Sequence, residues 1–233
     1  MKYVRKGKEP APLRAWKRDN RHTPGELVYG GIGFPTDALK VQFLKEQGHI
    51  CAYTMKRLST PADCHIEHIQ PRSLNPDLTL DHRNMVVCFP FNGGDVRPGY
   101  GAPIKANASV DVTTFVSPLS TRCEVAFSYG PDGNVKATDP SDQAALRTID
   151  ILHLDHPVLM ELREAAIKGY GIKRVSADPL SAAEARRLSK DILKTSSNGF
   201  LPEFCVAIQQ VALRYAQSEE QYAKRVKGQR KSR

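Results

Sequence analysis

The chain contains 233 residues, with 34 Lys and Arg against 25 Asp and Glu, and its formal net charge is +9. This length is enough to bury a hydrophobic core in one large or two small domains. A hydrophobic content of 40% is that of an ordinary soluble protein, and no apolar run is long enough to cross a bilayer. The basic excess favours a polyanionic partner, although solubility or an acidic protein partner explains the same charge.

Residues 1–34 are predicted to form a basic N-terminal arm and a Gly-rich loop. The opening stretch KYVRKGKEPAPLRAWKRDNR is charged throughout and lacks the apolar segment of a secretory signal. The arm is expected to lie on a phosphate backbone, to dock into a partner or to stay solvated; Trp16 favours docking, because large aromatics prefer interfaces. Five scattered cysteines argue against a disulfide scaffold and predict a cytoplasmic protein.

A helix is predicted from Thr36 to about Gln47. Thr36 is a suitable N-cap, and Gly48 stands at the C-terminal stop position. Apolar side chains recur between them at helical spacing: Leu39, Phe43 and Leu44. We expect this helix to pack beside the segment that follows it.

The most informative stretch is residues 64–92, where two short apolar runs flank a loop rich in Pro, Asn and Asp. Hydrolysis of a phosphodiester requires an activated water and a cation against the charge that develops on the phosphate. His68 is the predicted general base, because an imidazole titrates near neutral pH. Glu67 is the predicted metal ligand, since Mg²⁺ prefers oxygen donors. Asn84 is expected to orient the imidazole or to complete the coordination.

Each of these residues has an ordinary explanation when it is taken singly. An adjacent Glu-His pair is common at a solvated strand end, and Asn is a frequent turn residue. Their combination favours a metal-dependent nuclease, because the loop between them has a suitable length and a Cys follows the second run.

Residues 47–73, QGHICAYTMKRLSTPADCHIEHIQPRS, resemble the opening of HNH endonucleases encoded beside bacterial retrons and in Septu anti-phage systems, the PtuB-like family. Family members carry a CAYC knuckle, an IEHF-P-S segment, a D-x-x-N-L loop, a Cys and an HC…K segment. The later segments VSPLSTRCEVAFSYGPDGNV and IDILHLDHPVLMELREA resemble the family's post-catalytic hairpin and the entry to its next helix. The resemblance implies a nuclease core, with its preceding helix, at residues 35–108.

The chain departs from the family at the ligands of a structural zinc. The knuckle is Cys51-Ala52-Tyr53-Thr54, without its second Cys. Cys51 and Cys88 remain of the family set, whereas a structural zinc needs four nitrogen or sulfur ligands. We therefore expect no structural zinc, with Cys64 as the nearby thiol that would substitute for a lost ligand.

The chain also lacks a His that the resemblance implies as a catalytic metal ligand. Counted back from Lys105, the family's HC pair falls near Tyr100-Gly101. Asn92 and Asp95 are the nearest candidates to replace the missing His. The sequence leaves open whether the site is weakened, remodelled or inactive.

Four residues are candidates for contacts with nucleic-acid phosphate: His65, Arg72, Arg97 and Lys105. Arg72 follows the predicted base closely, and a guanidinium suits phosphate geometry, although a surface role is the default for an arginine. Lys105 matches the family lysine. For His65 we expect no more than such a contact.

Short secondary-structure elements are predicted after the second apolar run. Pro98 and Pro103 cannot occupy a helix interior, so the helix that closes the core must be short and begin near Ala102. Residues 122–137 predict a hairpin around the turn GPDGN, with one face made by Cys123, Val125 and Phe127.

The rest of the region 109–217 is predicted to be helical, with helices at 144–152, 157–168, 182–195 and 202–217. Ser181 and Glu184 form a capping box for the third of these. Residues 218–233 are predicted to form a basic tail, which contacts nucleic acid or is disordered.

Together these features predict an α+β fold with a ββα-metal (HNH) core embedded in a mainly helical body. The expected activity is endonucleolytic hydrolysis of DNA with Mg²⁺ or Mn²⁺. The resemblance implies an effector subunit of anti-phage defence with a PtuA-like ATPase partner of the ABC/SMC type and, in retron systems, a reverse transcriptase with its msDNA. The alternatives are a catalytically degenerate protein that binds its partner or nucleic acid without cutting, and a nuclease that cleaves RNA such as tRNA.

Overall fold

The computed structural model describes residues 1–231 except 24, 26, 112 and 173–178. The chain combines helices with small antiparallel sheets, which confirms an α+β architecture. Its α-helices in the described part are α1 (Ala11–Asp19), α2 (Thr36–Glu46), α3 (Ala102–Lys105), α4 (Gln143–Leu152), α5 (Pro157–Lys168), α6 (Ala182–Asp191) and α7 (Cys205–Lys231).

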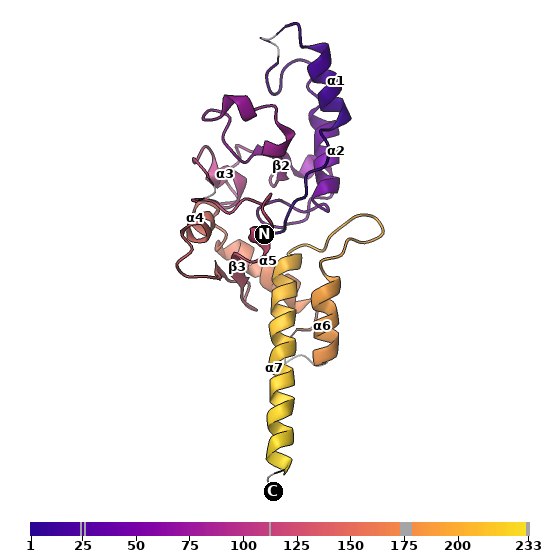
Figure 1. Cartoon of the computed structure of the whole chain (residues 1–233), viewed down its shortest axis with the longest axis vertical. Coiled ribbons are helices and arrows are strands. Elements are labelled where there is room, and N and C mark those ends of the chain that lie inside the picture. Colours follow the sequence, from indigo (N-terminus) through magenta and orange to yellow (C-terminus); the bar gives the residue numbers. More distant parts are fainter. Residues whose placement is uncertain (24, 26, 112, 173–178, 232–233) are drawn as a thin grey trace.

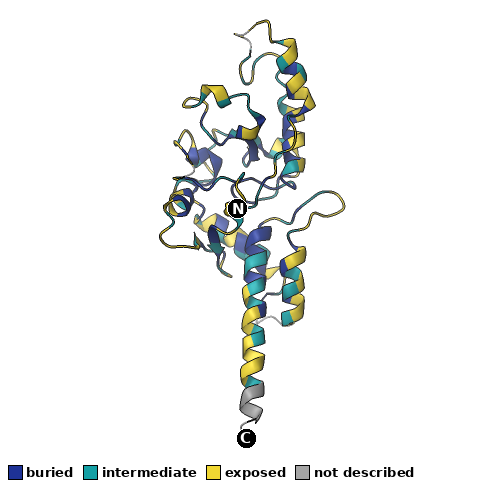
Figure 2. Cartoon of the chain, in the orientation of Figure 1, coloured by how far each residue is buried: buried dark blue, intermediate teal, exposed yellow. Residues whose placement is uncertain are grey.

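The elements are arranged along one long axis (Figure 1). Helices α1 and α2 lie at one end, the sheets and α3 to α5 occupy the middle, and α6 and α7 project side by side from the other end. Burial is concentrated along α2, in the middle and at the start of α7, as Figure 2 shows. No helix in the part of the chain described above is long and apolar enough to span a bilayer.

The first sheet pairs β1 (His65–His68) with β2 (Met85–Cys88) in antiparallel register, with His65 opposite Cys88 and His68 opposite Met85. All residues of β2 are buried, whereas β1 alternates between half-buried and buried residues. The loop between the strands contains the 3-10 turns Pro76–Leu78 and His82–Asn84. Helix α3 follows as a single turn that begins at Ala102, as the prolines predicted.

The second sheet is the predicted hairpin of β3 (Phe127–Tyr129) and β4 (Val135–Ala137). The prediction that Cys123, Val125 and Phe127 share one face is wrong. Residues Thr121–Glu124 form a 3-10 turn instead of a strand, so Val125 is 66% exposed while the other two side chains are buried.

The N-terminal residues are packed into the body of the protein, which corrects the prediction of an arm. Met1 and Val4 are buried, and the backbone N–H of Val4 donates to the carbonyl of Pro118 at 2.8 Å. Trp16 is also buried; its indole N–H donates to the carbonyl of Ile32 at 3.0 Å, so it docks within its own chain. The basic residues of this segment find partners in the chain as well: Lys6 pairs with Glu46 at 2.7 Å.

The boundaries of several helices differ from the predictions because caps and tertiary contacts set them. Helix α2 has Pro35 at its N-cap, and Thr36 is its first helical residue. The capping box of Ser181 and Glu184 is confirmed, but α6 ends at Asp191. Helix α7 continues to Lys231, through most of the stretch that was predicted as a basic tail.

Gln47, just after α2, fixes β2 beside that helix. Its side-chain amide donates to the carbonyls of Ile50 at 2.8 Å and Val87 at 2.9 Å, and its oxygen accepts from the N–H of Val87 at 2.8 Å. Gln47 is buried, so water could not take over these hydrogen bonds to the backbone of Ile50 and Val87 if the side-chain amide were removed. Gln47 therefore pairs with both backbone groups of Val87, while the N–H of Ala52 and the ammonium of Lys6 donate to the carbonyls of Val87 and Met85 on the same edge of β2.

We expect Gln47→Met to lower the free energy of unfolding by at least about 2 kcal/mol, because each buried polar group left unpaired costs about 1–3 kcal/mol. Urea denaturation followed by circular dichroism measures this change. Gln42→Met is the matched control, since Gln42 is exposed on the same helix and its replacement should stay within about 0.5 kcal/mol. Equal effects of the two substitutions would contradict the role of Gln47.

Candidate active site in a polar cleft beside β1

A polar cleft of about 340 Å³ opens beside β1. Its walls come from His65 to His68 on the strand, from Arg72, from Gly93 and Gly94 on the loop after β2, and from Ala102, Ala106 and Asn107 around α3. The predicted base and the predicted metal ligand therefore line one cavity.

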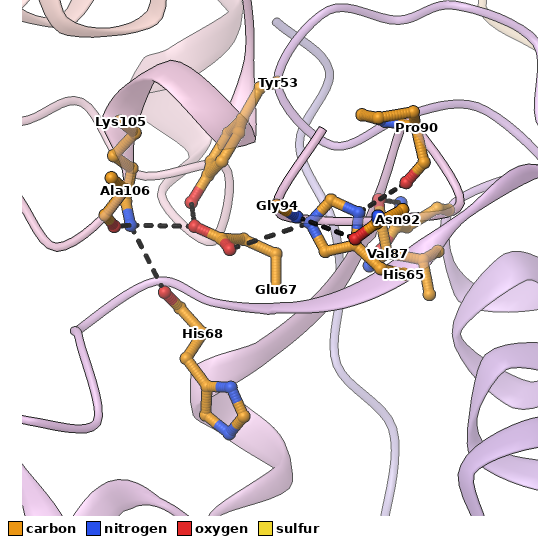
Figure 3. A network of polar contacts seen from close by, with 11 residues as sticks. Tyr53, His65, Glu67, His68, Val87, Pro90, Asn92, Gly94, Lys105 and Ala106 are labelled. Atoms are coloured by element: carbon orange, nitrogen blue, oxygen red, sulfur yellow. Dashed lines mark hydrogen bonds and ion pairs between the residues drawn. The ribbon is translucent and has the colours of Figure 1, made fainter. Parts of the chain in front are cut away.

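Glu67 projects from the half-buried face of β1 and is held on one side by a buried cation (Figure 3). The ammonium of Lys105 lies 2.7 Å from Oε1 of Glu67, and the Tyr53 hydroxyl donates to the same oxygen at 3.4 Å. The Lys105 side chain is 0% exposed, and that of Glu67 is 14% exposed. The carboxylate charge is thus balanced inside the protein.

Lys105 reaches Glu67 because α3 is a single turn whose last residue is Lys105. Its ammonium also donates to the carbonyl of His68 at 3.3 Å, so it joins the helix to the strand. Lys105 was predicted to contact phosphate. In the structure its ammonium points inward and is already satisfied, which corrects that prediction.

His65 faces Glu67 from two positions earlier on the same strand. Its Nδ1–H donates to the carbonyl of Pro90, and its Nε2 lies 3.8 Å from Oε2 of Glu67. Burial alone would lower the pKa of His65, but the neighbouring carboxylate of Glu67 and the Pro90 carbonyl outweigh burial and raise it. The sequence signal was present, since residues at i and i+2 share a strand face, but we had expected only a phosphate contact there.

The side chain of His68 projects from the buried face of β1, and a different backbone carbonyl, that of Thr79, fixes its ring. Nε2–H donates to the carbonyl of Thr79 at 2.9 Å, which leaves Nδ1 with its lone pair. The ring of Tyr29 packs edge-on against the imidazole at 4.6 Å between centroids. Burial lowers the pKa of His68, so the neutral form that can accept a proton is favoured.

Asn84 lies at the end of the loop between the strands and not in the cleft. Its amide accepts from the N–H of Gln70 at 2.8 Å and donates to the carbonyls of Gln70 at 3.0 Å and Leu78 at 3.3 Å. These contacts occupy the side chain, so the structure does not bring Asn84 to Glu67 as a coordinating group. Asn84 instead holds the loop at Leu78. The next residue in that loop, Thr79, has the carbonyl that accepts from Nε2–H of His68.

The two candidates for the missing His have other partners. The side-chain oxygen of Asn92 accepts from the N–H of Gly94 at 3.0 Å, and the carboxylate of Asp95 binds Arg97 through both oxygens at 2.8 Å. Neither Asn92 nor Asp95 lines the cleft, which corrects their assignment as replacement ligands. Arg97 lies outside the cleft wall too, with its side chain 89% exposed.

The phosphate contact of Arg72 stays a prediction, and the structure shows the surroundings of this side chain. It lines the cleft, it is exposed, and its guanidinium lies 4.6 Å from the ring centroid of Tyr29. Stacking on an aromatic ring holds a guanidinium in place while leaving its N–H groups free to donate. Arg72 is therefore the cleft residue best suited to receive a phosphate.

The four positions that the resemblance aligned with zinc ligands, Cys51, Thr54, Cys88 and Gly101, lie together in the fold. Cys51 hydrogen-bonds to Cys88 and Thr54, and the Thr54 methyl lies 3.4 Å from where a Cβ on Gly101 would stand. Burial would raise the pKa of Cys51, but these hydrogen bonds lower it to about 6. Cys64 is turned away, with its thiol directed to the carbonyls of Thr60 and Pro61.

Tyr100 is the position at which the resemblance predicted the lost metal-ligand His. It is buried, and its hydroxyl accepts from Lys56 at 3.0 Å. It does not line the cleft. In the described part of the chain, no three His, Cys, Asp or Glu side chains converge closely enough to hold a metal without help.

A divalent ion in this cleft would be held by Glu67 together with His65, whose Nε2 is directed at the carboxylate and would release its proton to bind the ion. A carboxylate and an imidazole are both ordinary ligands of divalent ions, and the polar cleft leaves room for water or phosphate oxygens to complete the coordination. The residues present thus fit a divalent ion that accepts one oxygen and one nitrogen donor.

No known family model matches the chain, and no curated protein matches it. The residues of the cleft therefore carry the assignment of function.

We expect Lys105→Met to lower the free energy of unfolding by about 3 kcal/mol, because it leaves a largely buried carboxylate without its cation. The double substitution Lys105→Met with Glu67→Gln should recover most of this loss. A double-mutant cycle in urea, with EDTA present, measures the coupling between the two side chains. Additive effects would show that the ion pair contributes nothing to stability.

We expect His65 to titrate above the ordinary histidine pKa of about 6.5 and His68 below it. Between the two pKa values His65 is then charged while His68 is neutral. An NMR titration of the histidine ring protons, with each signal assigned through a His→Gln variant, checks this order. The reverse order, or a common pKa, would contradict the environments described for the two rings.

Proposed function

We propose that the protein is a metal-dependent HNH endonuclease that hydrolyses phosphodiester bonds in DNA within the cleft beside β1. One observation carries the proposal. His68 and Glu67 both line this cleft, and the imidazole of His68 is fixed through Nε2–H by the carbonyl of Thr79, which leaves Nδ1 as its basic atom. The ring and the Glu67 carboxylate lie on opposite faces of β1, so the proposal needs the attacking water to reach Nδ1 from the cleft.

The order of the elements supports the HNH assignment. A strand, a loop, an antiparallel strand and a short helix follow one another, and the last residue of α3 contacts the first strand through Glu67. This is the ββα order that the resemblance to PtuB-like proteins implies. The positions of the family's zinc ligands also lie together, as a chain of that ancestry requires.

The side chains of the cleft divide the work of the reaction. Nδ1 of His68 accepts the proton of the attacking water, and Asn84 keeps the loop in place that orients the ring. Arg72 binds a phosphate oxygen at the cleft edge. A divalent ion bound at Glu67 would supply positive charge against the phosphate.

The resemblance also supports a setting for this activity. We propose that the protein acts in the cytoplasm as the nuclease subunit of a Septu-type or retron-type anti-phage system. Its partner would be a PtuA-like ATPase of the ABC/SMC type, with a retron reverse transcriptase and msDNA in some systems. The ATPase would supply nucleotide sensing, because the sequence contains no P-loop motif.

A second candidate is a protein of the same fold that binds its partner or nucleic acid without cutting. The observation that favours it is the ammonium of Lys105, which already neutralises Glu67 at 2.7 Å. Tyr100 in the place of the family His points the same way. The side chains of the cleft do not distinguish DNA from RNA, so RNA cleavage belongs in the same test.

We expect His68→Ala to reduce cleavage by about 10²–10⁴-fold, which is the usual contribution of a general base. The protein is co-purified with the product of its neighbouring gene, and cleavage of plasmid DNA and of tRNA is assayed with Mg²⁺, with Mn²⁺ and with EDTA. His22→Ala is the control, since His22 is exposed and lies far from β1 in sequence. Assembly with the partner should be unchanged in both variants.

Undiminished cleavage by His68→Ala would show that another residue is the base. Absence of metal-dependent cleavage by the parent complex on either substrate, with binding retained, would favour the second candidate.

A further inference from the structure

We propose that His65 is an imidazole ligand of the cleft's divalent cation, and that with Glu67 it forms a two-residue site that prefers Mn²⁺ to Mg²⁺. The assignment rests on the proposed function, since that reaction is what the ion would serve. It adds a ligand that neither the HNH motif nor the resemblance supplied. Three features of the structure lead to it.

The first feature is that His65 is oriented from its far side. Its Nδ1–H donates to the carbonyl of Pro90, so Nε2 points toward Glu67 (Figure 3) and is the nitrogen that binds an ion once it has lost its proton. Histidines that bind metals commonly donate their other ring N–H to a carbonyl or carboxylate, which fixes the tautomer and the ring plane. His65 has this arrangement on the cleft side of β1.

The second feature is that Glu67 is anchored from the opposite side. Lys105 and Tyr53 both contact Oε1, and Oε2 is left facing Nε2 of His65 at 3.8 Å. This separation is longer than a hydrogen bond. It is shorter than twice a typical metal–ligand bond of about 2.1 Å, so one ion can reach both atoms without a backbone shift.

The third feature is that the loop after β2 closes directly over the His65 ring. A Cβ at Gly93 would stand 2.8 Å from Cδ2 of His65, so only glycine allows this approach. The side chains of His65 and Glu67 are each 14% exposed. The two ligand side chains are thus already in place and largely shielded from solvent before an ion binds. Their loss of conformational entropy occurs on folding and does not weaken the binding of the ion.

His65 resolves the absence of the family's metal-ligand His. Tyr100 is bound to Lys56, and Asn92 and Asp95 are engaged within their own loop. His65 is the imidazole that the fold directs at Glu67. A nitrogen ligand disfavours Mg²⁺, which takes oxygen donors and keeps its waters, more strongly than it disfavours Mn²⁺, the first ion of the transition-metal affinity series.

The test measures Mn²⁺ binding to the purified full-length chain by electron paramagnetic resonance, in which the free ion gives the signal. His65→Asn is the key variant, because the Asn amide can still donate to the Pro90 carbonyl but has no atom at the place of Nε2. We expect it to weaken Mn²⁺ binding by at least about 10-fold, the smallest loss usual when a metal site is perturbed. Glu67→Gln should do the same, whereas His68→Asn and the exposed control His22→Asn should not.

Spin-echo modulation of the bound Mn²⁺ gives a second readout that does not depend on affinity. Modulation from an imidazole nitrogen should be present in the parent chain and in His68→Asn. In His65→Asn it should be absent at saturating Mn²⁺. Urea midpoints confirm that each variant is folded.

Mn²⁺ binding with unchanged affinity and nitrogen modulation in His65→Asn would overturn the ligand assignment, and so would a parent chain that binds no Mn²⁺. Tighter binding of Mg²⁺ than of Mn²⁺ would overturn the metal preference. If Mn²⁺ binding requires His65 but the complex never cleaves nucleic acid, the assignment of His65 as a ligand stands and the proposed nuclease activity is wrong. If cleavage requires His68 but Mn²⁺ binding does not depend on His65, the nuclease activity stands and the ligand assignment is wrong.

Discussion

The arrangement of the cleft depends on one buried ion pair, between the ammonium of Lys105 and the carboxylate of Glu67. An ammonium with no exposed surface is costly to bury unless a carboxylate and carbonyl oxygens compensate it, and here Glu67 and the His68 carbonyl do so. The pair connects α3 to β1 across a long stretch of chain. It also divides the functions of the Glu67 oxygens, since Oε1 is occupied by Lys105 and Oε2 faces the cleft.

The two histidines of β1 show how one short strand creates two chemical environments. His65 lies on the face of Glu67, where the carboxylate favours the charged ring. His68 lies on the other face against Tyr29, where burial favours the neutral ring. Titratable groups whose environments push their pKa values apart mark sites of proton transfer and ligation. Both imidazoles donate to a backbone carbonyl, so each presents a defined nitrogen to its surroundings.

The rest of the chain holds this strand pair rigidly. Gln47 pairs with the backbone of Val87 on β2, Asn84 closes the loop between the strands, and the N-terminal residues pack into the same core. The basic N-terminal segment had suggested an arm because local charge density is high there. Two of its cations, Lys2 and Lys6, instead pair with acidic residues distant in the sequence, Glu124 and Glu46. Local composition does not contain such pairings.

The sequence by itself determined the features that depend on neighbouring residues. The prolines limited α3 to a single turn, and Ser181 with Glu184 capped α6. Only the tertiary structure decided which partner each polar side chain takes. The ammonium of Lys105 pairs with Glu67 and is not exposed to solvent, and the side chain of Asn84 bonds to the loop backbone and does not reach the cleft. These choices follow from burial and from contacts between distant segments, where desolvation sets the strength of every charge and hydrogen bond.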